Sequence, residues 1–134
     1  MAYRSFEELD VWQKACRQSV SIYLEFEACR KFTLKDQIER SGLSVASNIA
    51  EGCERNSPVE FQRFLNIAQG SNGEIRTQLY IAKKLELITQ EAFNNMLSES
   101  KEISAMLRGL WRSIEDRKHD ERSQKQPPSH HTEN

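Results

Sequence analysis

Apolar side chains recur every three or four residues in four separate stretches of the chain, and this spacing constrains the fold more than any other feature of the sequence. Three or four residues make about one turn of an α-helix, so each stretch predicts a helix with a single apolar face. The stretches cover about residues 6–28, 34–51, 58–87 and 90–116. No segment shows the alternation of apolar and polar residues that indicates a half-buried strand. The chain is therefore predicted to be all-α.

Four of the expected helix ends carry recognisable signals, three of them in the second, third and fourth helices. Ser57, Pro58 and Glu60 combine an N-capping hydroxyl, a first-turn proline and a capping-box acid, and they mark the start of the third helix. Thr89 is expected to cap the fourth helix. Gly52 follows the second apolar stretch and suits the left-handed residue that closes many helices.

The first helix is expected to begin at a capping box formed by Ser5 and Glu8. Its apolar face advances in steps of three and four residues. That face is predicted to consist of Phe6, Leu9, Trp12, Cys16, Val20 and Tyr23.

Short linkers join the expected helices, at about residues 29–33, 53–57 and 87–89. Because linkers of this length turn each helix back beside the preceding one, we predict an antiparallel, up-down-up-down four-helix bundle over residues 1–117. Residues 118–134 contain no apolar residue type and hold all three histidines of the chain. Such a segment buries too little surface to offset its ordering entropy, so it is expected to be a disordered tail.

A polar stripe runs beside the apolar face on the second and third helices. Its members are Gln37, Arg40, Ser44, Asn48, Glu51, Ser71, Glu74 and Gln78. The stripe is either a solvated face or a hydrogen-bonded network that is buried or faces another subunit. Its small and amide side chains favour the network, which would fix helix register or oligomer geometry.

A turn centred near residue 56 sets Gly42 opposite Gly70 and predicts a close crossing of the second and third helices there. The same register predicts an ion pair between Arg40 and Glu74. A glycine costs a helix interior about 1 kcal/mol relative to alanine, so Gly70 needs a compensating benefit. The close crossing is one explanation, and the approach of a ligand or another subunit is the other.

Residues 1–117 contain no histidine, the residue type that most metal sites and activated nucleophiles need. The three cysteines are widely spaced and are expected to act as small apolar side chains. Two pairs of acids three residues apart, Glu51 with Glu54 and Glu99 with Glu102, have a spacing that charged helices produce by chance. We therefore expect no enzymatic activity, no cofactor, no metal and no small-molecule substrate.

The charges nearly balance, with 19 Lys and Arg against 20 Asp and Glu, for a formal net charge of −1. The chain therefore lacks the excess positive charge with which strongly basic proteins hold nucleic acid. A local basic patch is still expected where two turns meet at one end of the bundle. Its members are Arg30, Lys31, Lys35, Lys83 and Lys84.

Residues 1–20 lack the apolar core of a signal peptide, and no stretch of the sequence is apolar for long enough to span a membrane. We therefore expect a soluble, cytoplasmic protein that does not enter a membrane.

Several motifs resemble those of a bacterial protein family. They are Leu9-x-Val11-Trp12-Gln13, Ser44-Val45-x-x-Asn48-Ile49-Ala50-Glu51-Gly52 and Ala68-x-Gly70-Ser71-x-x-Glu74. Over about residues 5–115 the chain resembles the four-helix-bundle proteins encoded in intervening sequences of 23S rRNA genes. The resemblance implies a homo-oligomer, specifically a homopentamer, and carries no enzymatic activity with it.

The chain is also similar to the accessory protein of diversity-generating retroelements, a basic pentameric bundle associated with a reverse transcriptase and nucleic acid. Its near-neutral charge departs from that relative. Two hypotheses about function follow. The first is a self-assembling protein that acts through protein–protein interaction, and the alternative is an RNA- or DNA-binding accessory protein that acts as a homo-oligomer on rRNA or a retroelement-type nucleic acid.

Overall fold

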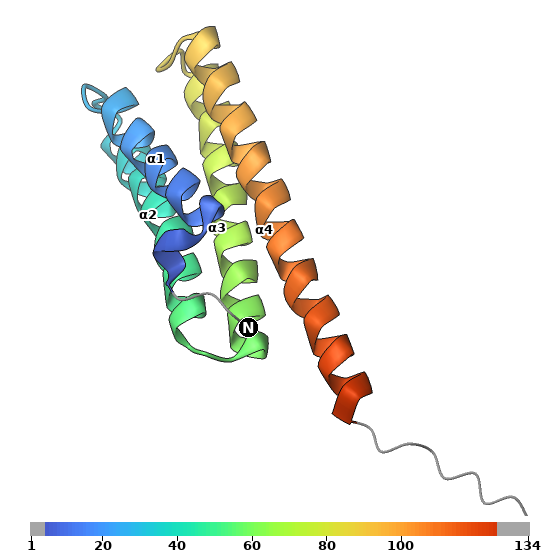
Figure 1. Ribbon diagram of the computed structural model, residues 1–134. Coiled ribbons are helices and arrows are strands. Elements are labelled where there is room, and N and C mark those ends of the chain that lie inside the picture. Colours follow the sequence, from blue (N-terminus) through green and yellow to red (C-terminus); the bar gives the residue numbers. More distant parts are fainter. Residues whose placement is uncertain (1–4, 126–134) are drawn as a thin grey trace, which may run out of the picture.

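A computed structural model describes residues 5–125 of the chain. Its elements, in order, are a single 3₁₀ turn, η1 (Phe6–Glu8), and the helices α1 (Asp10–Glu25), α2 (Phe32–Glu54), α3 (Pro58–Lys84) and α4 (Gln90–Lys125). Each helix packs against the next one along the chain, and α1 also contacts α4, which closes the bundle. Successive helices run in opposite directions, and α4 continues beyond the turn that joins α2 to α3 (Figure 1). The predicted up-down-up-down bundle is confirmed.

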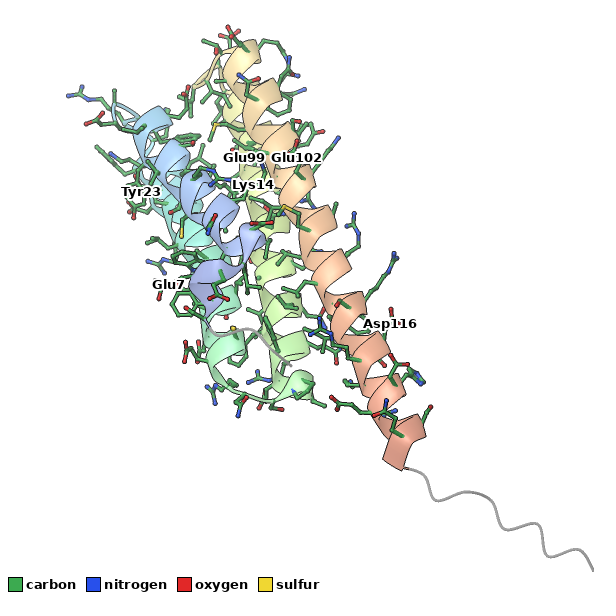
Figure 2. The ribbon with its side chains drawn as sticks, in the orientation of Figure 1. Glu7, Lys14, Tyr23, Glu99, Glu102 and Asp116 are labelled. Atoms are coloured by element: carbon green, nitrogen blue, oxygen red, sulfur yellow. The ribbon has the colours of Figure 1, made fainter. Side chains whose placement is uncertain are left out.

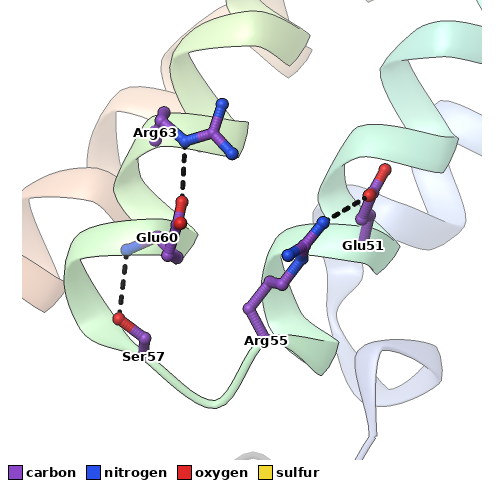
Figure 3. Close-up of polar contacts among 5 residues, drawn as sticks. All are labelled: Glu51, Arg55, Ser57, Glu60 and Arg63. Atoms are coloured by element: carbon purple, nitrogen blue, oxygen red, sulfur yellow. Dashed lines mark hydrogen bonds and ion pairs between the residues drawn. The ribbon is translucent and has the colours of Figure 1, made fainter.

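The turn between α2 and α3 follows the predicted capping signals. Ser57 Oγ accepts a hydrogen bond of 3.3 Å from the Glu60 backbone N–H, with a proline in the first turn of α3. Figure 3 shows this cap together with two ion pairs, Arg63 with Glu60 at 2.7 Å and Arg55 with Glu51 at 3.0 Å. The cap satisfies an N–H group that the first turn of a helix leaves unpaired, and so fixes where α3 begins.

The expected first helix, 6–28, is divided at Leu9 and ends at Glu25. Ser5 caps the η1 turn by accepting a hydrogen bond of 3.1 Å from the Glu7 N–H, and Leu9 is extended, with φ −79° and ψ 122°. The predicted apolar face is wrong at Val20 and Tyr23, which are 58% and 42% exposed. The buried side chains of α1 are Val11, Ala15, Gln18, Ser19 and Ile22.

The close packing of α1 on α2 explains this difference. A β-carbon built at Gly42 would lie 3.5 Å from Ser19 Cα and 3.0 Å from Ile22 Cδ1. With the two backbones this close, the side of α1 that faces α2 accommodates small side chains such as Ser19. The prediction from hydrophobicity alone instead placed Val20 and Tyr23, each one position further along the helix, on the buried face.

Gly52 does not close α2, and the predicted end near residue 51 is wrong. The helix begins at Phe32 and runs through Gly52 to Glu54, none of the described glycines has a positive φ, and the left-handed residue of the turn is Asn56, with φ 53°. Gly52 has another role, because a β-carbon there would lie 2.6 Å from Phe64 Cβ. The missing side chain allows α3 to lie directly against α2.

The third and fourth helices also end at different residues from those predicted. α3 ends at Lys84, where residue 87 was expected, and Glu86 turns the chain with φ 58°. Thr89 caps α4 as predicted, since its Oγ1 accepts a hydrogen bond of 3.1 Å from the Ala92 N–H.

α4 continues to Lys125, so the expected end near residue 116 and the expected disorder are wrong for residues 118–125. Lys118 Nζ lies 2.6 Å from Gln62 Oε1 on α3 and 3.0 Å from Glu115 Oε2. These contacts hold the first turn of the expected tail against α3 without any apolar burial. The rest of the predicted tail, 126–134, lies outside the described residues.

The interior is one apolar core to which all four helices contribute. Its largest fully buried side chains include Ile22, Phe26, Ile38, Ile49, Phe61, Leu65, Ile75, Leu79, Ile103, Leu107 and Ile114. In residues 5–125 no helix is both long enough and apolar enough to cross a membrane.

Candidate functional site

The middle of the predicted polar stripe forms a hydrogen-bonded network between α2 and α3. Ser44 Oγ and Ser71 Oγ are 2.8 Å apart, and Ser41 Oγ donates to Glu74 Oε2 at 3.2 Å. Gln78 Nε2 donates to Ser41 Oγ at 3.3 Å, which extends the network by one turn. Ser71 and Ser41 are buried, whereas Glu74 is exposed. The network therefore lies along the edge of the α2–α3 contact.

Four members of the stripe, all on α2, form no hydrogen bond to α3 in the described residues. Asn48 Nδ2 bonds within α2, to the Ser44 carbonyl at 2.8 Å and to Ser44 Oγ at 3.0 Å. Gln37, Arg40 and Glu51 are exposed, and Glu51 pairs with an arginine one turn later. The stripe thus combines both of the alternatives that the sequence leaves open, with a bonded centre that extends to Gln78 and with exposed side chains elsewhere on α2.

The predicted register of α2 on α3 is wrong by about three residues, close to one helical turn, because Ser44 lies opposite Ser71 where the predicted register places Ser41. Ser41, not Arg40, contacts Glu74, and no ion pair joins Arg40 to Glu74 in the described residues. The predicted crossing of Gly42 with Gly70 is also absent. Gly42 faces α1, and a β-carbon at Gly70 would meet nothing within 4 Å. The linker length predicted an antiparallel pair correctly but did not determine how far α3 slides along α2.

A row of residues spaced three or four apart follows the side of α3 that borders this network and ends at Leu85, the residue after the helix. Gln78 in this row is half-buried, and we call the exposed members the outer row: Ile67, Gly70, Glu74, Ile81 and Leu85. Its three apolar members are 40%, 46% and 53% exposed. Ile81 and Gln78 also line an open groove of about 640 Å³, opposite Phe32 and Leu34 of α2. An apolar surface therefore continues from α3 onto the start of α2.

The five residues of the predicted basic patch lie around this end of the bundle. Arg30 and Lys31 line the groove, Lys35 Nζ donates to the Glu27 carbonyl at 3.1 Å, and Lys83 Nζ lies 4.4 Å from the centre of the Phe93 ring. Lys84 is exposed near the end of α3. None of the five forms an ion pair with a carboxylate in the part of the chain that the structure describes.

A buried polar layer that sequence reasoning missed crosses the core. Gln18 Nε2 donates to Asn72 Oδ1 at 3.2 Å, Asn72 Nδ2 donates to the Ser100 carbonyl at 2.8 Å, and Ser100 Oγ donates to Asn72 Oδ1 at 2.8 Å. Asn72 is fully buried. A signal was present in the sequence, because Asn72 falls between Ala68 and Ile75 on the apolar stripe of α3. The layer joins α1, α3 and α4 and so restricts how they align.

A second polar group joins α3 to the far part of α4. Gln62 Nε2 donates to Glu115 Oε2 at 2.8 Å and to the Trp111 carbonyl at 3.3 Å. The hydrogen bond from Gln62 lowers the pKa of the Glu115 carboxyl, and the hydrogen bond and charge of Lys118 act in the same direction. Hydrogen bonds to the ionised form of a carboxyl have this effect.

Acidic side chains meet Lys14 where α1 faces α4 (Figure 2). Lys14 Nζ lies 2.7 Å from Glu102 Oε2, and burial raises the pKa of Glu99, although Lys14 and Arg17 act against that rise. Within residues 5–125 no group of three or more His, Cys, Asp and Glu side chains is placed to hold a metal ion. Glu99 and Glu102 are therefore best described as parts of a charged contact between two helices.

Two comparisons with known proteins point to the same protein family. The sequence model of the 23S rRNA-intervening sequence protein family matches residues 7–109. A solved structure from Bacteroides thetaiotaomicron VPI-5482, described as a protein of unknown function from the S23 ribosomal protein family, is similar with a TM-score of 0.71 and 30% sequence identity. The match covers 75% of this chain and 97% of that one. No curated protein matches the chain.

Proposed function

We propose that this chain, which belongs to the 23S rRNA-intervening sequence protein family, works by assembling with copies of itself and through protein–protein contacts, and not as an enzyme. The observation that carries the proposal is the outer row of α3. Three of its five residues are apolar and substantially exposed; Ile67 and Ile81 lie on one side of α3, and Leu85 directly follows the helix. Aligned apolar residues of this kind mark interaction surfaces, whereas single exposed apolar residues are ordinary.

Gly70 supports the same surface. A glycine inside a helix costs about 1 kcal/mol relative to alanine. Nothing in the described chain uses the space that its missing side chain leaves, because a β-carbon there would meet no atom within 4 Å. The benefit that offsets the cost is then expected outside the chain, where a second copy approaches the α3 backbone closely.

The bonded centre of the polar stripe gives this surface a defined shape. The pairs Ser44–Ser71 and Ser41–Glu74 hold the edge of α2 against α3. Glu74 is exposed and accepts its hydrogen bond from Ser41, so its carboxylate also faces outward, available to a donor on a neighbouring copy. Polar groups at such positions select one register among several apolar ones. Five copies, the number that the resemblance implies, are proposed for the assembly.

Light scattering after size-exclusion chromatography tests the proposal directly. At micromolar concentration we expect a closed oligomer, with five times the 15.6 kDa of the chain for a pentamer. Ile67→Lys and Ile81→Lys are each expected to shift the protein toward the monomer. Leu24→Lys is the matched control, because Leu24 is 68% exposed on α1. A wild-type monomer would refute self-assembly, and dissociation by Leu24→Lys alone would place the interface elsewhere.

A pair of glycine variants tests the role of Gly70. Neither Gly70 nor Gly109 has an atom within 4 Å of an added β-carbon, so alanine fits inside the chain at both positions. Gly70→Ala is expected to weaken assembly, whereas Gly109→Ala is expected to leave it unchanged. Equal oligomer dissociation constants for the two variants would remove Gly70 from the interface.

Nucleic-acid binding is the alternative function. One observation favours it: the five residues of the basic patch have no carboxylate partner in residues 5–125, and two of them border an open groove. In an oligomer the patch would be repeated, which strengthens binding to a polyanion. The test is a gel-shift titration with rRNA fragments at low salt, comparing the wild type with a variant in which Arg30, Lys31, Lys83 and Lys84 are replaced by Gln. No shift by micromolar wild-type protein would exclude this function.

A further inference from the structure

A cavity of about 410 Å³ lies between α3 and the middle of α4, away from the outer row and the basic patch. It is lined by Leu65, Asn66, Gln69, Arg76, Ser104, Leu107, Arg108, Trp111 and Arg112. Cavities that hold small ligands have volumes of about 300–1,000 Å³. Three of the nine lining residues are arginines and none is acidic. In a chain with a net charge of −1, this local excess of positive charge is distinctive.

Two of the guanidinium groups are held in place by serines. Arg76 Nη1 donates to Ser100 Oγ at 3.2 Å, and Ser100 belongs to the buried polar layer. Arg108 Nη1 donates to Ser104 Oγ at 3.0 Å. Each guanidinium has five N–H groups, so a single hydrogen bond to a serine positions it and leaves most of its donors free.

The Arg76 guanidinium lies beside Gly73, one turn earlier on α3. The nearest atom to a β-carbon built at Gly73 is Arg76 Nη2, at 3.9 Å. The Arg76 side chain therefore folds back along its own helix, over a residue that has no side chain. A separation of 3.9 Å is an ordinary van der Waals contact, so a β-carbon at this position would also fit beside the guanidinium.

The carboxylates nearest in sequence to the lining residues are already engaged. Glu74, two residues before Arg76, is bonded to Ser41, and Glu102, two residues before Ser104, is paired with Lys14. Glu115 follows Arg112 by three residues and is bonded to Gln62 and Lys118. Arg76, Arg108 and Arg112 form no ion pair in residues 5–125. The three charges thus converge on one cavity with no anion of the described chain to neutralise them.

Other donors and an apolar wall complete the lining. Asn66 is exposed beside the arginines and adds an amide group. Gln69 and Ser104 are bonded to each other, with Ser104 Oγ donating to Gln69 Oε1 at 2.7 Å, and they form a polar wall that keeps its shape. Leu65, Leu107 and Trp111 supply apolar surface next to these donors.

We propose that this cavity between α3 and α4 binds a phosphate monoester, with Arg76, Arg108 and Arg112 holding the phosphate and the apolar wall contacting the organic group attached to it. The planar fork of arginine matches the oxygens of phosphate in a bidentate manner. Three guanidinium groups suit a dianion with three free oxygens better than a carboxylate, which has one charge and two oxygens. The cavity also has room for more than the phosphate alone.

Isothermal titration calorimetry at low salt tests the proposal with adenosine 5′-monophosphate, inorganic phosphate and adenosine. Both phosphate-containing probes are expected to bind, the nucleotide more tightly, and adenosine is not. Arg108→Gln combined with Arg112→Gln is expected to weaken nucleotide binding at least about tenfold, because each lost contact is a charged hydrogen bond. Both residues are exposed, so the variant is expected to fold, which circular dichroism checks.

Arg40→Gln is the matched control, since Arg40 is exposed on α2 and its replacement removes the same charge far from the cavity. This variant is expected to change the affinity for the nucleotide by less than about twofold, because salt screens the interaction between a distant surface charge and the bound phosphate. The proposal is overturned if the phosphate-containing probes show no binding at millimolar concentration. It is also overturned if Arg40→Gln weakens binding as much as the double variant, or if adenosine binds as well as its phosphate ester.

The phosphate could come from a free nucleotide or from the 5′ end of an RNA strand, and a second titration separates these sources. It uses a short single-stranded RNA with and without a 5′ phosphate. Tighter binding of the phosphorylated strand than of the nucleotide supports an RNA end as the ligand, and equal binding supports a free nucleotide. Binding of both strands with equal affinity, together with no binding of the nucleotide, contradicts the cavity as a monoester site.

Discussion

Replacing Gly52 with alanine would place a methyl carbon in the tightest contact between α2 and α3. An ideal β-carbon at this position lies 2.6 Å from Phe64 Cβ and 3.1 Å from Phe61 Cδ1. Non-bonded carbon atoms prefer separations of about 3.5–4.0 Å. Phe64 Cβ is bonded directly to the backbone and cannot rotate away, so the two helices must separate locally by roughly 1 Å.

Two opposing contributions determine the expected change in the free energy of unfolding. Overpacking a well-packed contact by one methyl group costs about 1–3 kcal/mol. Alanine in place of glycine favours the helix by about 1 kcal/mol. Because the clash involves a rigid atom, we expect the upper part of the first range and a net loss of about 1–2 kcal/mol, or roughly 3–8 °C in melting temperature.

Urea unfolding followed by circular dichroism measures this change, with Gly109→Ala as the matched control. An added β-carbon at Gly109 meets nothing within 4 Å, so that variant is expected to gain about 1 kcal/mol. All proteins are compared at one concentration, because assembly makes stability depend on concentration. A Gly52→Ala midpoint equal to or above that of the wild type would refute the close contact between α2 and α3.

Four other substitutions test three separate parts of the fold. Asn72→Ala removes the centre of the buried polar layer and leaves Gln18 without its partner, so we expect urea unfolding to show a loss of about 2–4 kcal/mol; a loss below about 0.5 kcal/mol would contradict the layer's role. Val20→Ser is expected to change the free energy of unfolding by less than about 0.5 kcal/mol, whereas Ile22→Ala is expected to lower it by about 2–5 kcal/mol. Similar losses from both variants would support the apolar face predicted from the sequence. Glu115 has a lowered pKa in the folded protein, so its contribution to stability is present above the ordinary pKa of 4.5 and is lost as the pH falls through the folded value. The stability difference between the wild type and Glu115→Gln should therefore shrink on acidification below about pH 4.5, and an unchanged or growing difference would contradict this assignment.

The candidate surfaces could be predicted from the sequence only where the spacing of residues within a single helix places them together. The polar stripe was found because its spacing within each of two helices follows the helical repeat, and Ser44, Ser71 and Glu74 do lie along the α2–α3 edge. The partner of Glu74 was predicted wrongly, because a shift of about three residues between the two helices changes every pair across them. The arginine-lined cavity was not found at all, since Arg76 and Arg112 are far apart in the sequence and meet only through the pairing of α3 with α4.

The sequence by itself determined the number of helices, their antiparallel order and two of their starting points, because apolar spacing, short linkers and the caps at Ser57 and Thr89 all act over a few residues. Only the tertiary structure decided which side of α1 is buried, why Gly52 is needed, and how far α4 continues. These features depend on distances between backbones and on side chains from different helices. A contact such as Lys118 with Gln62 stabilises a turn that local composition assigned to disorder, so packing rather than local preference decided where the fold ends.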